Sequence, residues 1–244
     1  MTLPAWIAPQ LATRVRWNMN TDTPLPPEEP ASANPPDGAI IDYWLASDPS
    51  GPVTVEVVDG AGVVVRRYSS ADPVTRVADG GHVPRYWIRP TRVLGARAGA
   101  HRFLWDLKYQ APAGFNRSFP VAAVKGNTDR EPDGVWVMPG RYQVRLTVNG
   151  QRLTQPLVVR MDPRVKTPAV GLLAQFQWSR RISLAADAIA RLSDQSAVRP
   201  LLGQLQQLYS AFQNADVTPT DQLVAATRER LAEAALKARG TAPE

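Results

Sequence analysis

Apolar and polar residues alternate along much of the chain. In the clearest segment they fall on two sides, with Tyr142, Val144, Leu146 and Val148 on one and Arg141, Gln143, Arg145 and Thr147 on the other. A period of two is typical of a strand with one buried and one hydrated face. A second alternating segment, 151–160, follows directly after Asn149-Gly150, a pair that suits a type I′ turn. The pattern therefore predicts a β-hairpin.

The same pattern predicts further strands earlier in the chain, over residues 39–45, 53–58, 63–68, 99–107 and, more briefly, 119–124. The segments 53–58 and 63–68 are rich in β-branched residues and flank Asp59-Gly-Ala-Gly62, which allows a bulged or four-residue turn. About seven short strands separated by turns favour an antiparallel β-sandwich over alternating strands and helices.

After Pro168 the apolar residues recur at helical spacing. The three runs are Leu172, Leu173, Phe176, Ile182, Ala186, Ile189 and Leu192, then Leu201, Leu205, Leu208 and Phe212, then Leu223, Ala226 and Arg230 with Leu231 beside them. Thr218-Pro-Thr-Asp221 is a helix start, because Thr and Asp side chains accept hydrogen bonds from first-turn amides. Two or three antiparallel helices are expected, packed on each other, on the sheets or on another chain.

These patterns predict an α+β fold, mainly β, in three parts. Residues 1–38 form a proline-rich N-terminal wrap or linker, residues 39–165 the β-sandwich, and residues 166–240 the helical segment. The sandwich is followed by a C-terminal helical hairpin or three-helix unit.

Composition excludes several functions. The chain has no cysteine, so it offers neither a disulfide nor a thiolate ligand. The net charge of +6 invites a nucleic-acid partner, but Arg14, Arg66, Arg117, Arg145 and Arg180 stand in separate elements, so we expect a solvated basic surface and no specific nucleic-acid binding. No stretch is apolar enough to predict membrane insertion, and Met1–Gln10 lacks the features of a signal peptide.

Candidate catalytic groups are few. Glycoside hydrolysis uses two carboxylates across a cleft, and the carboxylates on ordered elements are Asp42, Glu56, Asp59, Asp106 and Asp162. Asp59 and Asp162 stand before Gly and Pro, where Asp commonly bonds the backbone. The histidines are His82 and His101, without a nucleophile elbow or clustered metal ligands. We predict no catalytic residues, no metal site and no cofactor.

Aromatic residues are the better functional candidates. Tryptophan can stack on a sugar or anchor a protein interface, and the proposed binding patch is Trp6, Trp17, Trp87, Trp136 and Trp178. The alternative is structural: Trp105 and Tyr43 fill the core, while Trp6 and Trp17 hold the N-terminal segment. If one strip is exposed, Trp87 with Trp136 is expected.

Five phrases together resemble a known family, namely Asn34-Pro-Pro-Asp-Gly-Ala-Ile-Ile-Asp-Tyr43, Val57-Val-Asp-Gly-Ala-Gly-Val-Val-Val-Arg-Arg-Tyr-Ser-Ser70, Gly99-Ala-His-Arg-Phe-Leu-Trp-Asp-Leu107, Pro139-Gly-Arg-Tyr142 and Val159-Arg-Met-Asp-Pro-Arg164. In this order they are similar to the region that follows the propeller in bacterial sortilin-like, or BNR-repeat, β-propeller proteins often labelled glycosyl hydrolases. The resemblance implies an immunoglobulin-like sandwich followed by helices, in an exported (periplasmic or extracellular) accessory module. The chain lacks the propeller and any Asp-box repeat, so no sialidase chemistry carries over.

The function expected from these observations is a non-catalytic structural or protein-interaction module accompanying a secreted β-propeller of this kind. The alternative is a carbohydrate-binding module or a fragment of a glycoside hydrolase. The expected partner is accordingly a β-propeller domain or other protein, or a carbohydrate.

Overall fold

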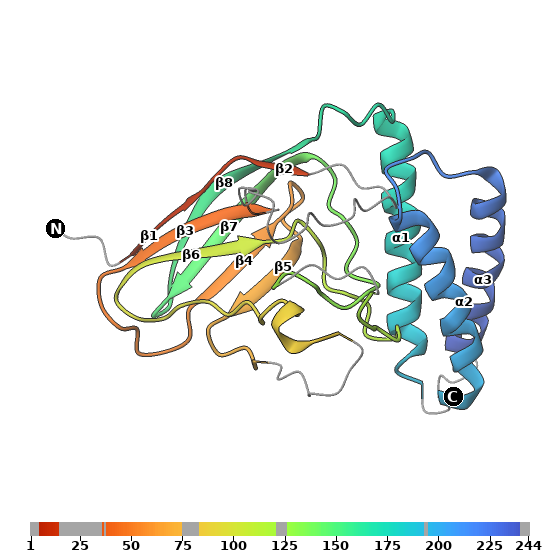
Figure 1. The fold of residues 1–244 in the computed structure, drawn as a ribbon, viewed down its shortest axis with the longest axis horizontal. Coiled ribbons are helices and arrows are strands. Elements are labelled where there is room, and N and C mark those ends of the chain that lie inside the picture. The colour runs from red at the N-terminus through yellow and green to blue at the C-terminus, as the bar shows by residue number, and fades with distance from the viewer. Residues whose placement is uncertain are drawn as a thin grey trace.

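A computed structural model describes residues 5–14, 36, 38–74, 83–120, 126–192 and 195–239. The strands are β1 (Ala5–Pro9), β2 (Ala12–Arg14), β3 (Ala39–Leu45), β4 (Thr54–Val58), β5 (Val64–Ser69), β6 (Gly99–Trp105), β7 (Gly140–Val148) and β8 (Gln151–Met161). The helices are α1 (Ala169–Ile189), α2 (Gln195–Gln213) and α3 (Asp221–Arg239), with a short 3₁₀ helix at Arg85–Trp87. The fold is α+β, with two sheets and three C-terminal helices, as the sequence predicts at this level (Figure 1).

The strands form a three-stranded sheet of order β1-β3-β6 and a five-stranded sheet of order β2-β8-β7-β4-β5. The two sheets face each other across one apolar core, in which Tyr68 packs edge-on against Phe103 and Trp105 against Tyr142. Trp105 and Tyr43 are 0% and 1% exposed, so the structural interpretation of these two aromatics is confirmed. We call the two sheets and their shared core the two-sheet unit.

Local chemistry explains the hairpins. Asn149 and Gly150 have φ of 49° and 78°, the left-handed conformation that the predicted turn between β7 and β8 requires. The Asp59 carboxylate accepts hydrogen bonds from the backbone N–H groups of Ala61 and Val63, which fixes the turn between β4 and β5. Both predicted hairpins are present.

Two strands were not predicted from the sequence. β1 pairs antiparallel with β3, and after Gln10 and Leu11 the chain crosses to the other sheet, where β2 pairs parallel with β8. The expected all-antiparallel sandwich is therefore wrong at this edge. A strand of three residues carries too little alternation to be recognised from sequence, and here it continues from the strand before it. The predicted strand over 119–124 falls largely outside the described residues.

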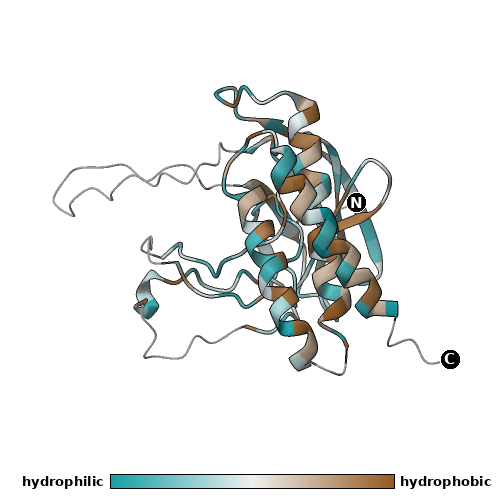
Figure 2. Cartoon of the chain, turned by 90° about the vertical axis from the view of Figure 1, so that its right-hand side faces the viewer, coloured by the Kyte–Doolittle hydropathy of each residue, from teal (hydrophilic) through white to brown (hydrophobic). Residues whose placement is uncertain are grey.

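The helices lie together at one end of the two-sheet unit (Figure 1). Their apolar stripes meet one another and the loops at that end, in a second core that includes Phe115 and Val135 from the loops and Ile182, Leu205 and Tyr209 from the helices. The predicted start of α3 is confirmed, since the Leu223 N–H donates to Oγ1 of Thr220. Figure 2 views this helical layer from the side away from the sheets, where apolar and polar residues are mixed. No helix in the described ranges is both long and apolar enough to span a membrane.

Candidate functional site

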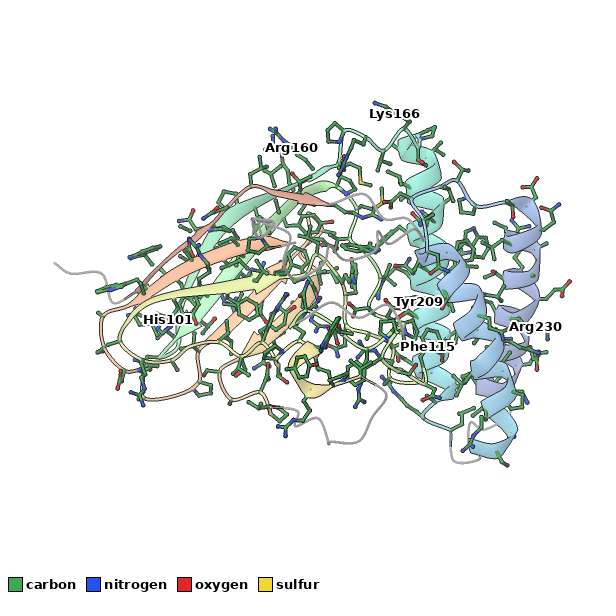
Figure 3. The ribbon with its side chains drawn as sticks, in the orientation of Figure 1. His101, Phe115, Arg160, Lys166, Tyr209 and Arg230 are labelled. Atoms are coloured by element: carbon green, nitrogen blue, oxygen red, sulfur yellow. The ribbon has the colours of Figure 1, made fainter. Side chains whose placement is uncertain are left out.

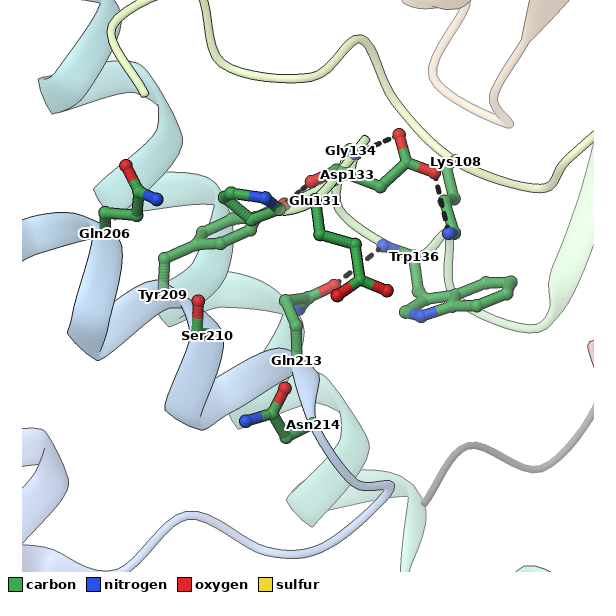
Figure 4. Close-up of a pocket in the computed structure, with 11 residues that line it drawn as sticks. Lys108, Glu131, Asp133, Gly134, Trp136, Gln206, Tyr209, Ser210, Gln213 and Asn214 are labelled. Carbon is green, nitrogen blue, oxygen red and sulfur yellow. Dashed lines mark hydrogen bonds and ion pairs between the residues drawn. The ribbon is translucent and has the colours of Figure 1, made fainter. Parts of the chain in front are cut away.

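A pocket of about 260 Å³ lies between α2 and the loop that leads into β7 (Figure 4). Its lining includes Lys108, Glu131, Asp133 and Trp136 from the connection between β6 and β7, and Tyr209 and Gln213 from α2. The volume falls below the range of roughly 300–1,000 Å³ that is common for small-molecule sites. The pocket nevertheless brings several ionisable groups to one cavity.

The groups of the pocket bond chiefly to one another. Lys108 Nζ donates to Oδ2 of Asp133 at 2.8 Å, and the Gly134 N–H donates to Oδ1 of the same carboxylate at 2.7 Å. The Tyr209 hydroxyl donates to the Asp133 carbonyl at 2.7 Å. Burial alone would raise the pKa of Asp133, but the Lys108 ammonium and these hydrogen bonds hold that pKa below its ordinary value. The Asp133 carboxylate is therefore ionised and holds Lys108 and Gly134 of its own connection, while the Asp133 backbone carbonyl bonds α2 through Tyr209.

Asp106 lies near this pair but does not line the pocket. Burial raises its pKa and the charge of Asp133 raises it further, while Lys108 opposes both. Two carboxylates with opposite pKa shifts are also what acid–base catalysis uses. Here, however, both Asp133 oxygens accept hydrogen bonds and Asp106 accepts one from the Lys108 N–H. The arrangement is that of a polar junction between the sheets and the helices.

Trp136, one of the predicted binding residues, is half-buried at this junction. The Lys108 ammonium lies 4.4 Å from its ring centroid and the Arg14 guanidinium 5.5 Å away. Such cation–π contacts stabilise the ring where it is. The indole is thus engaged within the protein, and it is not part of an exposed strip with Trp87.

A buried ion pair strengthens the same junction. Arg14 NH2 lies 2.5 Å from Oδ1 of Asp216, and both side chains are 3% exposed. Burial lowers the pKa of Arg14, and the Asp216 charge opposes that shift. The pair joins β2 to the loop between α2 and α3. In the second core, Phe115 packs edge-on against Tyr209 (Figure 3).

The other predicted aromatic residues are dispersed. Trp87 is half-buried in the 3₁₀ helix, and Trp178 lies on α1 with Arg181 4.8 Å and Arg228 of α3 5.6 Å from its ring. Trp6 on β1 is 42% exposed, and Trp17 lies outside the described residues. Of the predicted patch, the four described tryptophans Trp6, Trp87, Trp136 and Trp178 stand on separate segments, so the structure does not bring them together.

One aromatic surface does form, on the outer face of the three-stranded sheet. Trp6 stands directly opposite Trp44 of β3, a residue that the predicted patch omitted. The outward residues Ile40 and Leu104 pair further along the same face. We call Trp6, Trp44, Ile40 and Leu104 the aromatic face. Trp44 could have been found from the cross-strand register, but deriving that register requires that both β1 and β3 be predicted.

An ion pair lies within the aromatic face. Arg102 donates to both oxygens of Asp42, at 2.8 and 3.0 Å, and Gln10 donates to Oδ2 at 3.1 Å. The hydrogen bond from Arg102 lowers the pKa of Asp42. The carboxylate is therefore ionised and is held in place two residues along β3 from Trp44, on the same face of the sheet.

Two further predicted carboxylates and one histidine have local partners. Asp59 holds its own hairpin turn, and Asp162 bonds the guanidinium and N–H of Arg164, so the structural interpretation of both is confirmed. His101 stacks on Tyr43, with Nε2 2.6 Å from the Arg97 carbonyl. His82 lies outside the described residues. Among the residues that are described, no group of three His, Asp or Glu side chains could hold a metal ion.

Comparison with protein-family models, with curated proteins and with solved structures finds no match to this chain. The resemblance to sortilin-like β-propeller proteins therefore stays a prediction. The function has to be inferred from the surfaces and junctions described above.

Proposed function

We propose that this chain is a non-catalytic structural or protein-interaction module whose two-sheet unit is immunoglobulin-like. The strand orders support the immunoglobulin-like assignment. In immunoglobulin domains one sheet carries strands A, B, E and D, of which the described residues here have no D, and the other carries G, F and C, with C′ added in the variable type. The orders β1-β3-β6 and β8-β7-β4-β5 fit A-B-E and G-F-C-C′.

A side-chain contact also supports this assignment. Many such domains have a tyrosine near the start of strand F whose hydroxyl bonds the backbone a few residues upstream. Tyr142 near the start of β7 donates to the Met138 carbonyl at 2.6 Å. The chain departs from antibody domains because it has no cysteine and because its core tryptophan, Trp105, stands on β6 instead of strand C.

The observation that carries the interaction proposal is the exposure of Trp6 beside Trp44 on a paired sheet. Interfaces commonly centre on a few aromatic anchors among polar neighbours that exclude water. The aromatic face has this composition, with the Asp42–Arg102 pair beside the indoles. The pocket groups, in contrast, bond to each other and support a structural role.

The sequence resemblance suggests the partner: a β-propeller of the sortilin-like class, in an exported protein. The binding mode would be burial of the Trp6 indole in a pocket of the propeller. Propeller and module would then associate through the aromatic face, while the helices lie at the far end of the molecule.

The test is binding of the full chain to a purified sortilin-like β-propeller from the same genome, measured by calorimetry. Trp6→Ala is expected to weaken binding by about thirtyfold, as for an interface hot spot. Tyr86→Ala is the matched control, because Tyr86 is 67% exposed and lies outside this face, and it is expected to bind as the parent does. Absence of binding by the parent, or equal loss in both variants, would contradict the proposal. Binding of soluble neutral glycans that is lost in Trp6→Ala would instead support the carbohydrate-binding alternative.

A further inference from the structure

The outer face of the five-stranded sheet gathers arginines that are dispersed in the sequence. Five of them point outward, namely Arg67 of β5, Arg141 and Arg145 of β7, and Arg152 and Arg160 of β8. Arg145 is partly exposed and the other four are exposed. Figure 3 shows Arg160 extending away from the sheet. We call these five residues the basic face.

Several other cations of the described residues form ion pairs with carboxylates. Arg14, Arg102 and Lys108 form ion pairs with aspartates at 2.5–2.8 Å. Within the part of the chain that the structure describes, none of the five arginines of the basic face forms an ion pair. Glu56, opposite Arg145 and Arg67 in the register, is the one carboxylate among the outward residues of these five strands. The face therefore keeps a positive charge that folding does not use.

The register sets the spacing of the charges. Arg145 is opposite Thr154, so Arg152 is its diagonal neighbour, and Arg141 is opposite Val158, so Arg160 is its diagonal neighbour. Diagonal neighbours on a sheet are about 7–8 Å apart. Along the β7–β8 hairpin the four arginines cover eight residue steps, roughly 27 Å at the rise of a strand. They form a linear stripe, which suits an extended polyanion better than a single small anion.

The residues between the arginines indicate which kind of polyanion the basic face suits. Thr13, Thr54, Gln143, Thr147 and Thr154 face outward among them, together with the apolar Pro156 and Val158, and none of the outward residues of the five strands is aromatic. Single-stranded nucleic acids are usually held by aromatic stacking as well as charge. Hydroxyl and amide side chains instead suit a ligand that carries hydroxyl groups between its charges. Arginine pairs with carboxylates through two parallel hydrogen bonds.

We propose that the basic face binds an acidic polysaccharide, a uronate polymer whose carboxylates pair with the arginines while its hydroxyls bond the threonines. This inference goes beyond the protein-interaction role and uses the other sheet, so a partner on the aromatic face and a polysaccharide on the basic face bind independently.

The experiment measures binding of the full chain to polygalacturonate by affinity electrophoresis over a series of salt concentrations, with dextran and mixed-sequence duplex DNA as comparison polymers. The parent is expected to bind polygalacturonate at low salt, to lose affinity as salt rises, and to leave dextran unbound. The double variant Arg145→Gln/Arg152→Gln is expected to bind at least about tenfold more weakly, because it removes two charge-assisted contacts.

Arg199→Gln/Arg239→Gln is the matched control, since it removes the same charge from exposed arginines on α2 and α3. It is expected to retain affinity within about twofold, as exposed charges distant from the ligand are screened. The proposal is overturned if the parent does not bind polygalacturonate at low salt, if both double variants weaken equally, or if duplex DNA binds more tightly. Circular dichroism of each variant shows that it is folded. Loss of propeller binding in Trp6→Ala with polygalacturonate binding intact would separate the two proposals.

Discussion

The two-sheet unit and the junction between that unit and the helices are held together by different forces. The core of the two-sheet unit is apolar, with Ile41, Val55 and Leu146 all fully buried. The junction adds the buried Arg14–Asp216 ion pair and directed hydrogen bonds, among them the one from the Tyr209 hydroxyl of α2 to the Asp133 carbonyl. Apolar contacts are non-directional and accept many partners. Ion pairs fix one geometry, so the junction sets how the helices sit on the sheets.

The largest effect is expected in the apolar core. Trp105→Ala should lower the free energy of unfolding by about 4 kcal/mol, because it removes a fully buried indole and leaves a cavity. Urea unfolding followed by circular dichroism measures this. Tyr86→Ala, at an exposed aromatic, should change the value by less than about 0.5 kcal/mol. A small effect at Trp105 would mean that the core is not the main source of stability.

The next largest effect is expected at the junction and tests its stability apart from that of the core. Asp216→Ala should cost about 3 kcal/mol, because Arg14 is left buried without its counter-charge. The double variant Arg14→Met/Asp216→Ala should recover most of that loss. Hydrogen exchange should show faster opening of α2 and α3 and unchanged protection of β7 and β8. Equal loss in the single and double variants would show that the charge itself is not the cause.

The helices and six of the eight strands of the described residues could be predicted from the sequence because their signals are local. The alternation over 140–148 and the turn at Asn149-Gly150 lie within a few residues of each other. The junction could not be predicted, because Arg14 and Asp216 are 202 residues apart and nothing near either residue indicates the other. The aromatic face could not be predicted for a related reason, since the pairing of Trp6 with Trp44 depends on the unpredicted strand β1.

The basic face was within reach of sequence reasoning. Once Asn149 and Gly150 form a two-residue turn, Val148 must pair with Gln151, and the register of the whole hairpin follows. That register places Arg152 and Arg160 on the same side as Arg141 and Arg145. The arginines are dispersed along the chain, but the pairing of the predicted hairpin brings them together on one face.

Two neighbouring carboxylates sharpen the comparison further, because their folded-state pKa values shift in opposite directions. The pKa of Asp133 is lowered from 3.8, so its contribution to stability is present above that value and is lost as pH falls through the folded pKa. Asp133→Asn should therefore cost about 2 kcal/mol at neutral pH, and less in acid.

Asp106→Asn is the matched variant with the opposite sign. The pKa of Asp106 is raised from 3.8, first by burial, so its stabilising effect is present below that value and is lost as pH rises through the folded pKa. The variant should gain about 1 kcal/mol at neutral pH and nothing in acid. Thermal unfolding at several pH values tests both, and shifts of the same sign in the two variants would refute the assignment.

The smallest effect concerns tyrosines of the apolar core. Burial raises the pKa of Tyr43 from 10.0 to about 12, and it raises the pKa values of Tyr68 and Tyr142 further. Their stabilising contribution is complete below pH 10 and is lost as pH rises through the folded values. Titration of tyrosinate absorbance should show these groups ionising together with unfolding. Tyr43→Phe, which removes the hydrogen bond to the Gly95 carbonyl, should cost about 1 kcal/mol at neutral pH.

The Arg14–Asp216 pair also bears on how the chain is made. Arg14 leaves the ribosome 202 residues before Asp216, which is roughly ten to forty seconds at ordinary elongation rates. During that interval its guanidinium keeps its water, because burial without a counter-charge is too costly. The sheets can form while the helices are still being synthesised. The end of the two-sheet unit that contacts the helices loses its bound water only when the loop after α2 emerges.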